Sequence, residues 1–441
     1  MIGLAAFLVI WALATKALPF AREASGFTFA FAVLLLARRS LYLGTSLYAL
    51  SFSFVPLFPG RLLGVPALNV TNLMKLGLAG VAASTLAASK GERAVGRPAI
   101  TVVLVTYVWL LASVFMAVMG TGIAMGHGLD LWWKYVLATL PLFAAVGVAR
   151  QGGRGPAFLL GALAVSLVIL CIWAYVEYQI DLRGAGRTIR MAGRFGQANN
   201  FGGLLAIVLP GFVALAWEGP DRRRRLAGWF GCGIVGICLL STASRGSLLA
   251  GGLAFLALGI LRYRGLLVLF VAAAILAGPY LLPDQVKNRF TDALESGEDE
   301  GEVDNSTEIR KMMYTFAPVA FQDNPVFGAG LGGFPTIALN HGRPELARST
   351  HSWYLQVFTE MGLVGLALFG LLTATVIRGL RAGPRGQPGT LDGALTPVML
   401  AATVALAILC FFQDPFLDSE FIVPPYFLGL GLALGRSRGK A

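Results

Sequence analysis

Residues 157–178 read AFLLGALAVSLVILCIWAYVEY, and this stretch decides the fold class. As a helix it is long enough to cross a hydrocarbon core of ~30 Å, which takes about 20 apolar residues. Similar apolar runs recur along the whole chain of 441 residues, of which 56% are hydrophobic and only 13% charged, with a mean hydropathy of +0.71. Soluble domains have a much more polar composition. The sequence therefore predicts an all-α protein that crosses a membrane many times.

We expect about 12 to 14 transmembrane helices in a single transmembrane domain that spans residues 1–441. The range reflects short runs near the N-terminus, which could form a hairpin or one broken span. The first run, residues 2–20, has no basic start and no small-residue cleavage site, so we expect a membrane helix there and not a signal peptide. All the cysteines lie inside apolar runs, which indicates neither a disulfide framework nor a zinc site.

The basic residues indicate how the chain is oriented in the membrane. Basic loops are separated from one another by pairs of apolar runs, and they lie at residues 90–97, 150–154, 222–225, 262–264, 378–385 and 436–440. The positive-inside rule places all of these loops, and the C-terminus, in the cytoplasm. Topology thus accounts for most of the net charge of +12, and we expect no nucleic acid partner. The long segment 283–350 then faces the opposite side.

One external segment departs from this rule, because it is rich in arginine. Residues 181–203 read DLRGAGRTIRMAGRFGQANNFGG and contain Arg183, Arg187, Arg190 and Arg194. At spacings of three and four residues these arginines would share one face if the stretch were helical. A forked guanidinium suits phosphate oxygens, so the segment favours an anionic substrate. The alternative is contact with lipid headgroups or with nearby acidic residues.

Two further residues are candidates for chemistry on the same side. Arg245 lies at the tip of the turn TASRGS, residues 242–247, and an ionisable group within a membrane costs about 2.5–3.5 kcal/mol at a helix centre, so it is usually paired or functional. His351 opens the apolar run in STHSWYLQVFTEMGLVG, residues 349–365. An imidazole can accept a proton from an attacking hydroxyl near neutral pH. A snorkelling arginine and a structural histidine are the alternatives, and His127 and His341 are weaker candidates.

The external segment 283–350 contains three patterns. Residues 295–305, ESGEDEGEVDN, match no metal-coordination spacing, so we expect a solvated acidic loop and not a cation site. Residues 306–322 predict an amphipathic helix with a capping arrangement at its start, which could lie on the membrane. Residues 322–335, QDNPVFGAGLGGFP, form a glycine-rich turn that is too irregular for a nucleotide-binding fingerprint.

Three stretches taken together resemble the O-antigen ligase and polymerase superfamily of bacterial envelope enzymes. They are RMAGRFGQANNFGG at 190–203, STASRGS at 241–247, and DNPVFGAGLGGF at 323–334 followed by THSWYLQVFTEMGLVG at 350–365. Their order and spacing, with the long external segment before the last histidine, carry the resemblance, which covers roughly the second half of the chain.

The resemblance implies a glycosyltransferase with a GT-C-like membrane fold in the bacterial inner membrane. Its active site would face the periplasm and take a glycan from undecaprenyl pyrophosphate. Arg190 and Arg245 match the arginines thought to hold the donor pyrophosphate, and His351 matches the proposed general base. We add Arg194 and Arg348 to the donor site from their positions. The family often has Asn after this histidine, where this chain has serine.

Within this superfamily we expect a ligase that transfers the glycan to a hydroxyl of a lipid A core sugar, with inversion. Arginines on the leaving pyrophosphate can replace a metal ion, so we expect neither a metal nor a cofactor, and membrane lipids as the remaining partners.

A polymerase would use the same donor. Some polymerases carry an arginine followed eleven positions later by glycine, a spacing that the two long external segments lack. The sequence is also compatible with a relative that O-glycosylates proteins. A transporter of lipid-linked glycans is less favoured, because many transporters have two matching halves and this chain shows none.

Overall fold

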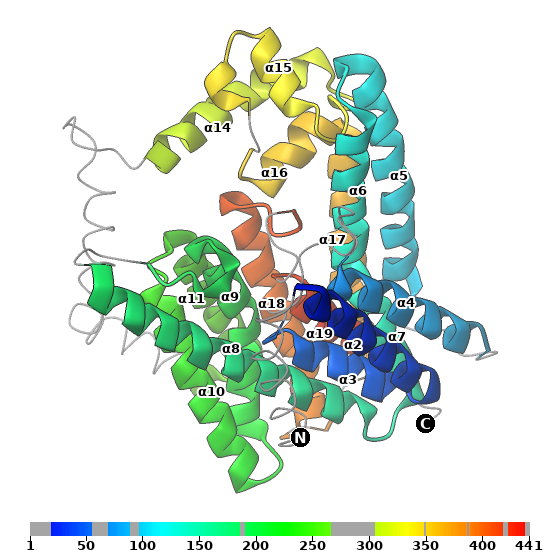
Figure 1. The fold of residues 1–441 in the computed structure, drawn as a ribbon, viewed down its shortest axis with the longest axis vertical. Coiled ribbons are helices and arrows are strands. Elements are labelled where there is room, and N and C mark those ends of the chain that lie inside the picture. The colour runs from blue at the N-terminus through cyan, green and yellow to red at the C-terminus, as the bar shows by residue number, and fades with distance from the viewer. Residues whose placement is uncertain are drawn as a thin grey trace.

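The protein was analysed as a computed structural model, which describes residues 19–54, 69–88, 97–185, 190–265, 305–347, 350–384, 386–387, 389–417 and 422–436. This part of the chain is helical and contains no strand (Figure 1), so the all-α prediction is confirmed. The elements are α2 (Pro19–Arg39), α3 (Leu41–Ser51), α4 (Val70–Ala88), α5 (Arg97–Thr121), α6 (Met125–Thr139), α7 (Pro141–Gln151), α8 (Gly155–Ala185), η2 (Gly193–Phe195), α9 (Ala198–Glu218), α10 (Arg222–Ser241), α11 (Arg245–Leu261), α14 (Asn305–Asp323), α15 (Phe334–Asn340), η3 (Pro344–Leu346), α16 (Trp353–Gln356), the π-helix η4 (Val357–Met361), α17 (Gly362–Ala382), α18 (Leu391–Phe412) and α19 (Pro424–Leu434).

The described residues contain seven helices that are long and apolar enough to cross a membrane. These spans are Arg97–Thr121, Met125–Gln151, Gly155–Leu182, Ala198–Glu218, Arg222–Ser241, Trp353–Ala382 and Leu391–Phe412. Three shorter apolar helices accompany them, at Val70–Leu86, Arg245–Leu261 and Pro424–Leu434. The polytopic membrane prediction is therefore confirmed. The total of 12 to 14 spans stays a prediction, because the apolar runs at 2–20 and 264–282 lie mostly outside the described residues.

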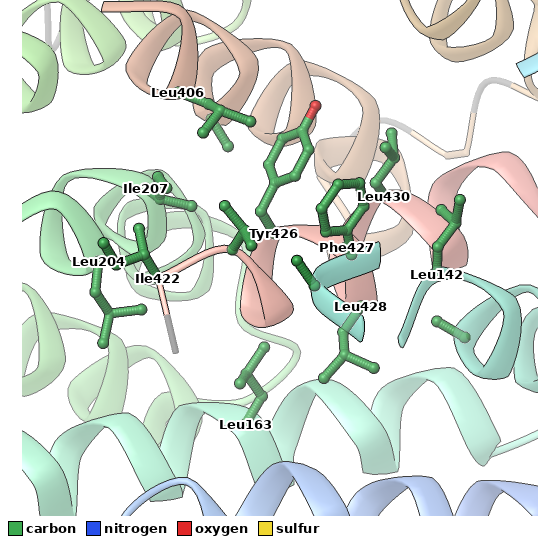
Figure 2. Packing of buried hydrophobic residues seen from close by; sticks show 14 of the residues in the cluster. Leu142, Leu163, Leu204, Ile207, Leu406, Ile422, Tyr426, Phe427, Leu428 and Leu430 are labelled. Atoms are coloured by element: carbon green, nitrogen blue, oxygen red, sulfur yellow. The ribbon is translucent and has the colours of Figure 1, made fainter. Parts of the chain in front are cut away.

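The short helix α19 lies at the centre of the main core. All of its residues are buried, as expected for a helix that is apolar on every side. Figure 2 shows how its side chains fill the space between four other helices. The residues that meet there are Tyr426, Phe427, Leu428 and Leu430 of α19 with Leu142 of α7, Leu163 of α8, Leu204 and Ile207 of α9, and Leu406 of α18.

Ion pairs tie helices together at the end that holds Arg262 and Arg436, which belong to two of the basic loops. Arg262, just after α11, bonds both carboxylate oxygens of Glu218 at the end of α9, at 2.8 and 3.2 Å. Arg436, just after α19, reaches Asp392 in the first turn of α18 at 3.2 Å. We call this the basic end. The helices α9, α11 and α18 run from it to the opposite end, where the end of α18 points toward α14 and α16 (Figure 1).

A cap, residues 305–346, covers that opposite end and has a small core of its own. The predicted amphipathic helix is confirmed as α14, which buries one side against α15, η3 and the start of the α16 span. The core consists of Met313, Phe316, Ala317, Ala320, Ala329, Phe334, Ile337, Ala338, Leu346 and Leu355. The acidic stretch 295–304 lies outside the described residues, and the assignment of 283–350 to the periplasm stays a prediction.

The glycine loop, residues 324–333, joins the cap to the membrane helices. Its amides at 329 and 330 each donate, at 2.9 Å, to the carbonyls of Thr359 and Glu360 respectively. These carbonyls belong to η4, and a π-helix shifts the regular backbone pattern by one residue. The next amide, at 331, donates to the hydroxyl of Ser113 in α5 at 2.9 Å. The glycine loop therefore fills the space between α5 and η4.

The glycines of this loop are needed for its backbone shape. Gly330 has a φ of +81°, and a Cβ there would collide with the backbone of Ala117 in α5. Beyond it, the buried carboxylate of Glu360 accepts hydrogen bonds from the amides of Gly332, at 2.9 Å, and Phe334, at 3.3 Å. The glycine-rich pattern thus has a structural role, because it lets the loop pack between the cap and the span that follows His351.

Candidate functional site

The C-terminal end of α18 is the point at which three distant parts of the chain meet. A helix leaves its last four carbonyls without intrahelical partners. Here donors from α14 and from the segment that enters α16 bond to the carbonyls of residues 410–413. The pairs are Ser352 Oγ to Cys410 at 3.2 Å, Tyr314 hydroxyl to Phe411 at 3.1 Å, an Arg310 guanidinium nitrogen to Phe412 at 3.3 Å, and Trp353 amide to Gln413 at 3.4 Å. We call residues 410–413 the α18 end.

His351 stands directly before this junction and is half-buried. The next residue, Ser352, caps α16 by accepting from the amide of Leu355 at 3.5 Å, and its own hydroxyl donates to the α18 end. His351 has a φ of +49°, in the left-handed region. Such a backbone is uncommon for a residue with a side chain and is found disproportionately at functional sites.

Arg245 reaches the α18 end from another direction. Ser244 caps α11 by accepting from the amide of Ser247 at 3.4 Å, so Arg245 is the first residue of the helix and is half-buried. The next residue, Gly246, lies against the last residue of α18, because a Cβ there would stand 2.7 Å from the ring of Phe412. This close approach places the start of α11 beside the α18 end.

Arg190 is fixed to the turn that precedes Arg245. Its Nε donates to the carbonyl of Thr242 at 3.0 Å, and a terminal nitrogen donates to Oδ1 of Asn199 at 2.8 Å. The following amide, of Met191, donates to the carbonyl of Ser241 at 3.0 Å. The Thr242 and Asn199 acceptors are neutral oxygens, which orient the guanidinium without cancelling its charge.

The backbone at the Thr242 turn is also unusual. Ala243 has a φ of +46°, and it and His351 are the two non-glycine residues with positive φ in the part of the chain that the structure describes. A left-handed backbone costs roughly 1–2 kcal/mol for a residue with a Cβ. One strained position is the predicted site residue His351 itself and the other lies two residues before Arg245, which supports a functional site at this end of the helices.

The structure therefore brings together the segments of three predicted site residues, Arg190, Arg245 and His351. Arg348, and the side chain of Arg194, whose backbone lies in η2, fall outside what the structure describes. The idea that four arginines share one helical face does not hold for the described backbone. The helix α8 ends at Ala185, and Arg190 is not helical.

The weaker histidine candidate in the cap has a different setting. The Nε2 atom of His341 lies 2.8 Å from a carboxylate oxygen of Asp323, at the end of α14, and both side chains are exposed. The ring also packs edge-on against Phe316 of the cap core. These contacts fit a structural role in the cap and not a place at the α18 end.

Sequence reasoning missed Arg310, which belongs to the same junction. This half-buried arginine of α14 donates to the carbonyl of Phe412, where the negative end of the helix dipole favours a cation. Its position in an amphipathic helix gives a weak signal at most. The partner is a backbone carbonyl from a helix about a hundred residues away, and backbone partners leave no mark on the sequence.

A buried network of polar side chains lies next to the α18 end. The hydroxyl of Tyr135 in α6 donates to Oδ2 of Asp414 at 3.1 Å, and it lies 3.4 Å from Oε1 of Gln356. The amide nitrogen of Gln356 in turn donates to the carboxylate of Glu360 at 3.0 Å. Asp414 also caps the turn that follows α18. The network links α6, α16 and η4 to Asp414, the residue after the α18 end, and none of its members was singled out from the sequence.

Comparison with known proteins bears on the middle of the chain. No curated protein matches this sequence. Residues 230–370 match the family model described as O-antigen ligase. The matched part runs from α10 into α17, so it includes Arg245, Arg310, the cap and His351, whereas Arg190 precedes it. Over residues 230–370, this match confirms the predicted resemblance to O-antigen ligases.

Proposed function

We propose that this protein is an O-antigen ligase that transfers a glycan from undecaprenyl pyrophosphate to a hydroxyl of a lipid A core sugar. The family match indicates activity of the ligase or polymerase type. One structural observation carries the proposal furthest. The segments of Arg190, Arg245 and His351, which are far apart in the sequence, meet at the α18 end, and positive φ angles occur at His351 itself and at Ala243, two residues before Arg245.

The reaction breaks the bond between the anomeric carbon and a phosphate oxygen. The pyrophosphate leaves with the electron pair, and the acceptor oxygen forms the new bond on the opposite face, so the anomeric centre inverts. Arginines stabilise the negative charge that grows on the leaving group, which is the form of electrostatic catalysis that active sites use most. Arg190 and Arg245 are the groups proposed for this role, and it requires no cofactor.

The acceptor hydroxyl must lose its proton as it attacks. We assign this proton to the imidazole of His351, because general base catalysis of this kind contributes about 10²–10⁴ in rate. The backbone of His351 is held by Ser352, whose hydroxyl bonds to the α18 end, and by the start of α16. These hydrogen bonds hold the backbone at His351 close to the segments that contain Arg190 and Arg245.

The proposal includes a membrane orientation. Arg262 and Arg436, from two of the basic loops, lie at the basic end, opposite the candidate site, so the positive-inside rule would put the site and the cap in the periplasm and the C-terminus in the cytoplasm of the inner membrane. The protein is then a single membrane domain with a periplasmic segment, 283–350, and a GT-C-like fold.

Because a polyprenyl tail stays in the bilayer, the donor would enter from the side. Arg194 and Arg348 are proposed as further donor contacts.

Product analysis tests this function. Purified protein is incubated with an undecaprenyl pyrophosphate-linked glycan and lipid A core, and the His351→Ala variant serves as the control. Transfer of the glycan to the core is the expected result, seen as a shifted core band that the variant does not give. Longer lipid-linked glycans would instead identify a polymerase. The absence of both products would contradict an enzyme of this class and favour a transporter.

A further inference from the structure

Gln413, the residue that follows α18, has a buried side-chain amide to which the proposed reaction gives no role. Only 4% of Gln413 is exposed, and its Nε2 atom has no hydrogen-bond partner among the residues that the structure describes. Its backbone, by contrast, is fully engaged, since its amide donates to Leu409 at 3.0 Å and its carbonyl accepts from Trp353 at 3.4 Å. The residue is therefore firmly placed while the donors of its side-chain amide nitrogen are left without an acceptor.

A leftover donor of this kind needs an explanation. Leaving a buried polar group unsatisfied costs about 1–3 kcal/mol, and native proteins contain few such groups. A leucine in the same place would avoid this cost. Retention of an amide is expected where the missing acceptor arrives with a ligand.

The position of this amide points to the kind of acceptor. A Cβ at Gly203 of α9 would stand 2.5 Å from Nε2 of Gln413, so the amide lies against the second turn of that helix. A Cβ at the neighbouring Gly202 would stand 2.7 Å from Oγ of Ser247, in the first turn of α11. Residues 199–203 thus have the α18 end on one side and the start of α11 on the other.

The same stretch of α9 also holds Arg190. Asn199 accepts from the Arg190 guanidinium through its side chain, at 2.8 Å, and from the hydroxyl of Ser247 through its carbonyl, at 3.2 Å. The N-terminal ends of α9 and α11 both lie here, and their dipoles are positive. The stretch of α9 that Gln413 contacts therefore also binds the Arg190 cation and lies at two helix N-termini, and an anionic oxygen is the acceptor that these groups favour.

We propose that the Gln413 amide donates a hydrogen bond to a non-bridging oxygen of the diphosphate of the lipid-linked donor. The inference rests on the proposed function and adds a donor-contacting residue to it, between the arginine segment before α9 and the start of α11. The amide carries no charge, so it adds orientation of the diphosphate to the electrostatic stabilisation that the arginines give.

Two substitutions at this position and one matched control test the inference. Gln413→Leu removes the donor while keeping a similar volume, and Gln413→Glu replaces the amide nitrogen with an anionic oxygen. Gln356→Leu is the control, because that buried amide has an acceptor, the carboxylate of Glu360. The measurements are the unfolding temperature of the purified full-length protein with and without undecaprenyl pyrophosphate, and kcat and KM for the lipid-linked donor.

Without ligand, Gln413→Leu should unfold at or above the wild-type temperature, whereas Gln356→Leu should unfold below it. Undecaprenyl pyrophosphate should stabilise the wild type more than Gln413→Leu. The donor KM of Gln413→Leu should rise about tenfold, the loss expected for one hydrogen bond to a charged group, and that of Gln413→Glu should rise further. The acceptor KM should stay unchanged.

Two results would overturn the inference while leaving the proposed function intact. One is an equal ligand stabilisation and donor KM in wild type and Gln413→Leu. The other is a drop in unfolding temperature for ligand-free Gln413→Leu with unchanged kinetics, since that is the behaviour of a purely structural amide. A wild type that undecaprenyl pyrophosphate does not stabilise would reject the donor itself, and the inference with it.

Discussion

The two ends of the helical bundle hold their arginines in different ways. At the basic end, Arg262 and Arg436 bond to the carboxylates of Glu218 and Asp392. Hydrogen bonding to Glu218 raises the pKa of the Arg262 guanidinium above its ordinary value. The opposite end holds Arg190, Arg245 and His351, and we call it the site end. There, the bonds of Arg190 to the Thr242 carbonyl and the Asn199 amide oxygen orient the cation, and these two acceptors do not cancel its charge. The carboxylate pairs of Arg262 and Arg436 tie helix ends together, whereas the bonds from Arg190 to Thr242 and Asn199 fix the direction of its guanidinium.

The turns at the two ends differ in a second way. At the basic end, the positive φ angles that the structure shows belong to glycines, such as Gly152, Gly153 and Gly389, which adopt them at little cost. At the site end, Ala243 and His351 adopt them despite their side chains. Strain that glycine could relieve has been kept beside Arg245 and at the proposed base. The difference indicates that geometry at the site end matters beyond stability.

The largest expected effect is that of His351→Asn. Asparagine tolerates the left-handed backbone better than most residues, so the substitution removes the base without adding strain. Transfer should fall by about 10²–10⁴, while the unfolding temperature stays at the wild-type value. Turnover with radiolabelled glycan donor measures the rate, and circular dichroism melts measure the stability. Turnover within a few fold of wild type would remove His351 from the mechanism.

The next effect tests how much the close contact between the glycine loop and α5 contributes to stability. Gly330→Ala should lower the free energy of unfolding by about 3 kcal/mol or more, because the new Cβ meets the backbone of Ala117 in addition to the backbone strain at a φ of +81°. Gly342→Ala is the matched control, with a φ of +68° and open space around it, and should cost roughly 1–2 kcal/mol. Melting temperatures of the two variants check the prediction. Equal losses would mean that the contact with α5 contributes little.

Lysine substitutions probe the two ends directly. Arg190→Lys keeps the charge but loses the forked bonds to Thr242 and Asn199, so the donor KM should rise about tenfold with little change in melting temperature. Arg262→Lys loses one of the two bonds to Glu218, so the melting temperature should fall while kcat and KM stay unchanged. A lower melting temperature with unchanged kinetics for Arg190→Lys would show that Arg190 serves the fold. Altered kinetics for Arg262→Lys would show that Arg262 serves the reaction.

The sequence was sufficient for those features that depend on local patterns. Apolar runs predicted the membrane helices, and the short motifs around Arg190, Arg245 and His351 predicted segments that the structure brings to one place. The membrane orientation, the roles of these residues and the contributions of Arg194 and Arg348 stay predictions. Local motifs work here because Arg245 begins a helix and His351 directly precedes a helix cap, positions where the sequence carries its own signals.

The rest of the site depends on which helix ends meet. Arg310 and Trp353 bond to carbonyls of the α18 end, and any residue provides a carbonyl, so no pattern marks the partner. The glycine loop owes its shape to a π-helix and to the close approach of α5, which are both tertiary features. Gln413 stands out only once its burial is known. A single sequence could not have predicted these contacts.

The smallest expected effect concerns the docking of the cap on the α18 end. The hydroxyl of Tyr314 donates to the Phe411 carbonyl at 3.1 Å, and the side chain is partly exposed, so Tyr314→Phe should cost only about 0.5–1.5 kcal/mol of stability. Local opening of the cap should respond more than global unfolding does, because α14 packs on a small core of its own. Hydrogen exchange should therefore speed up in α14 while α9 and α18 keep wild-type protection. Faster exchange in all three helices would instead show that the cap and the membrane helices unfold as one unit.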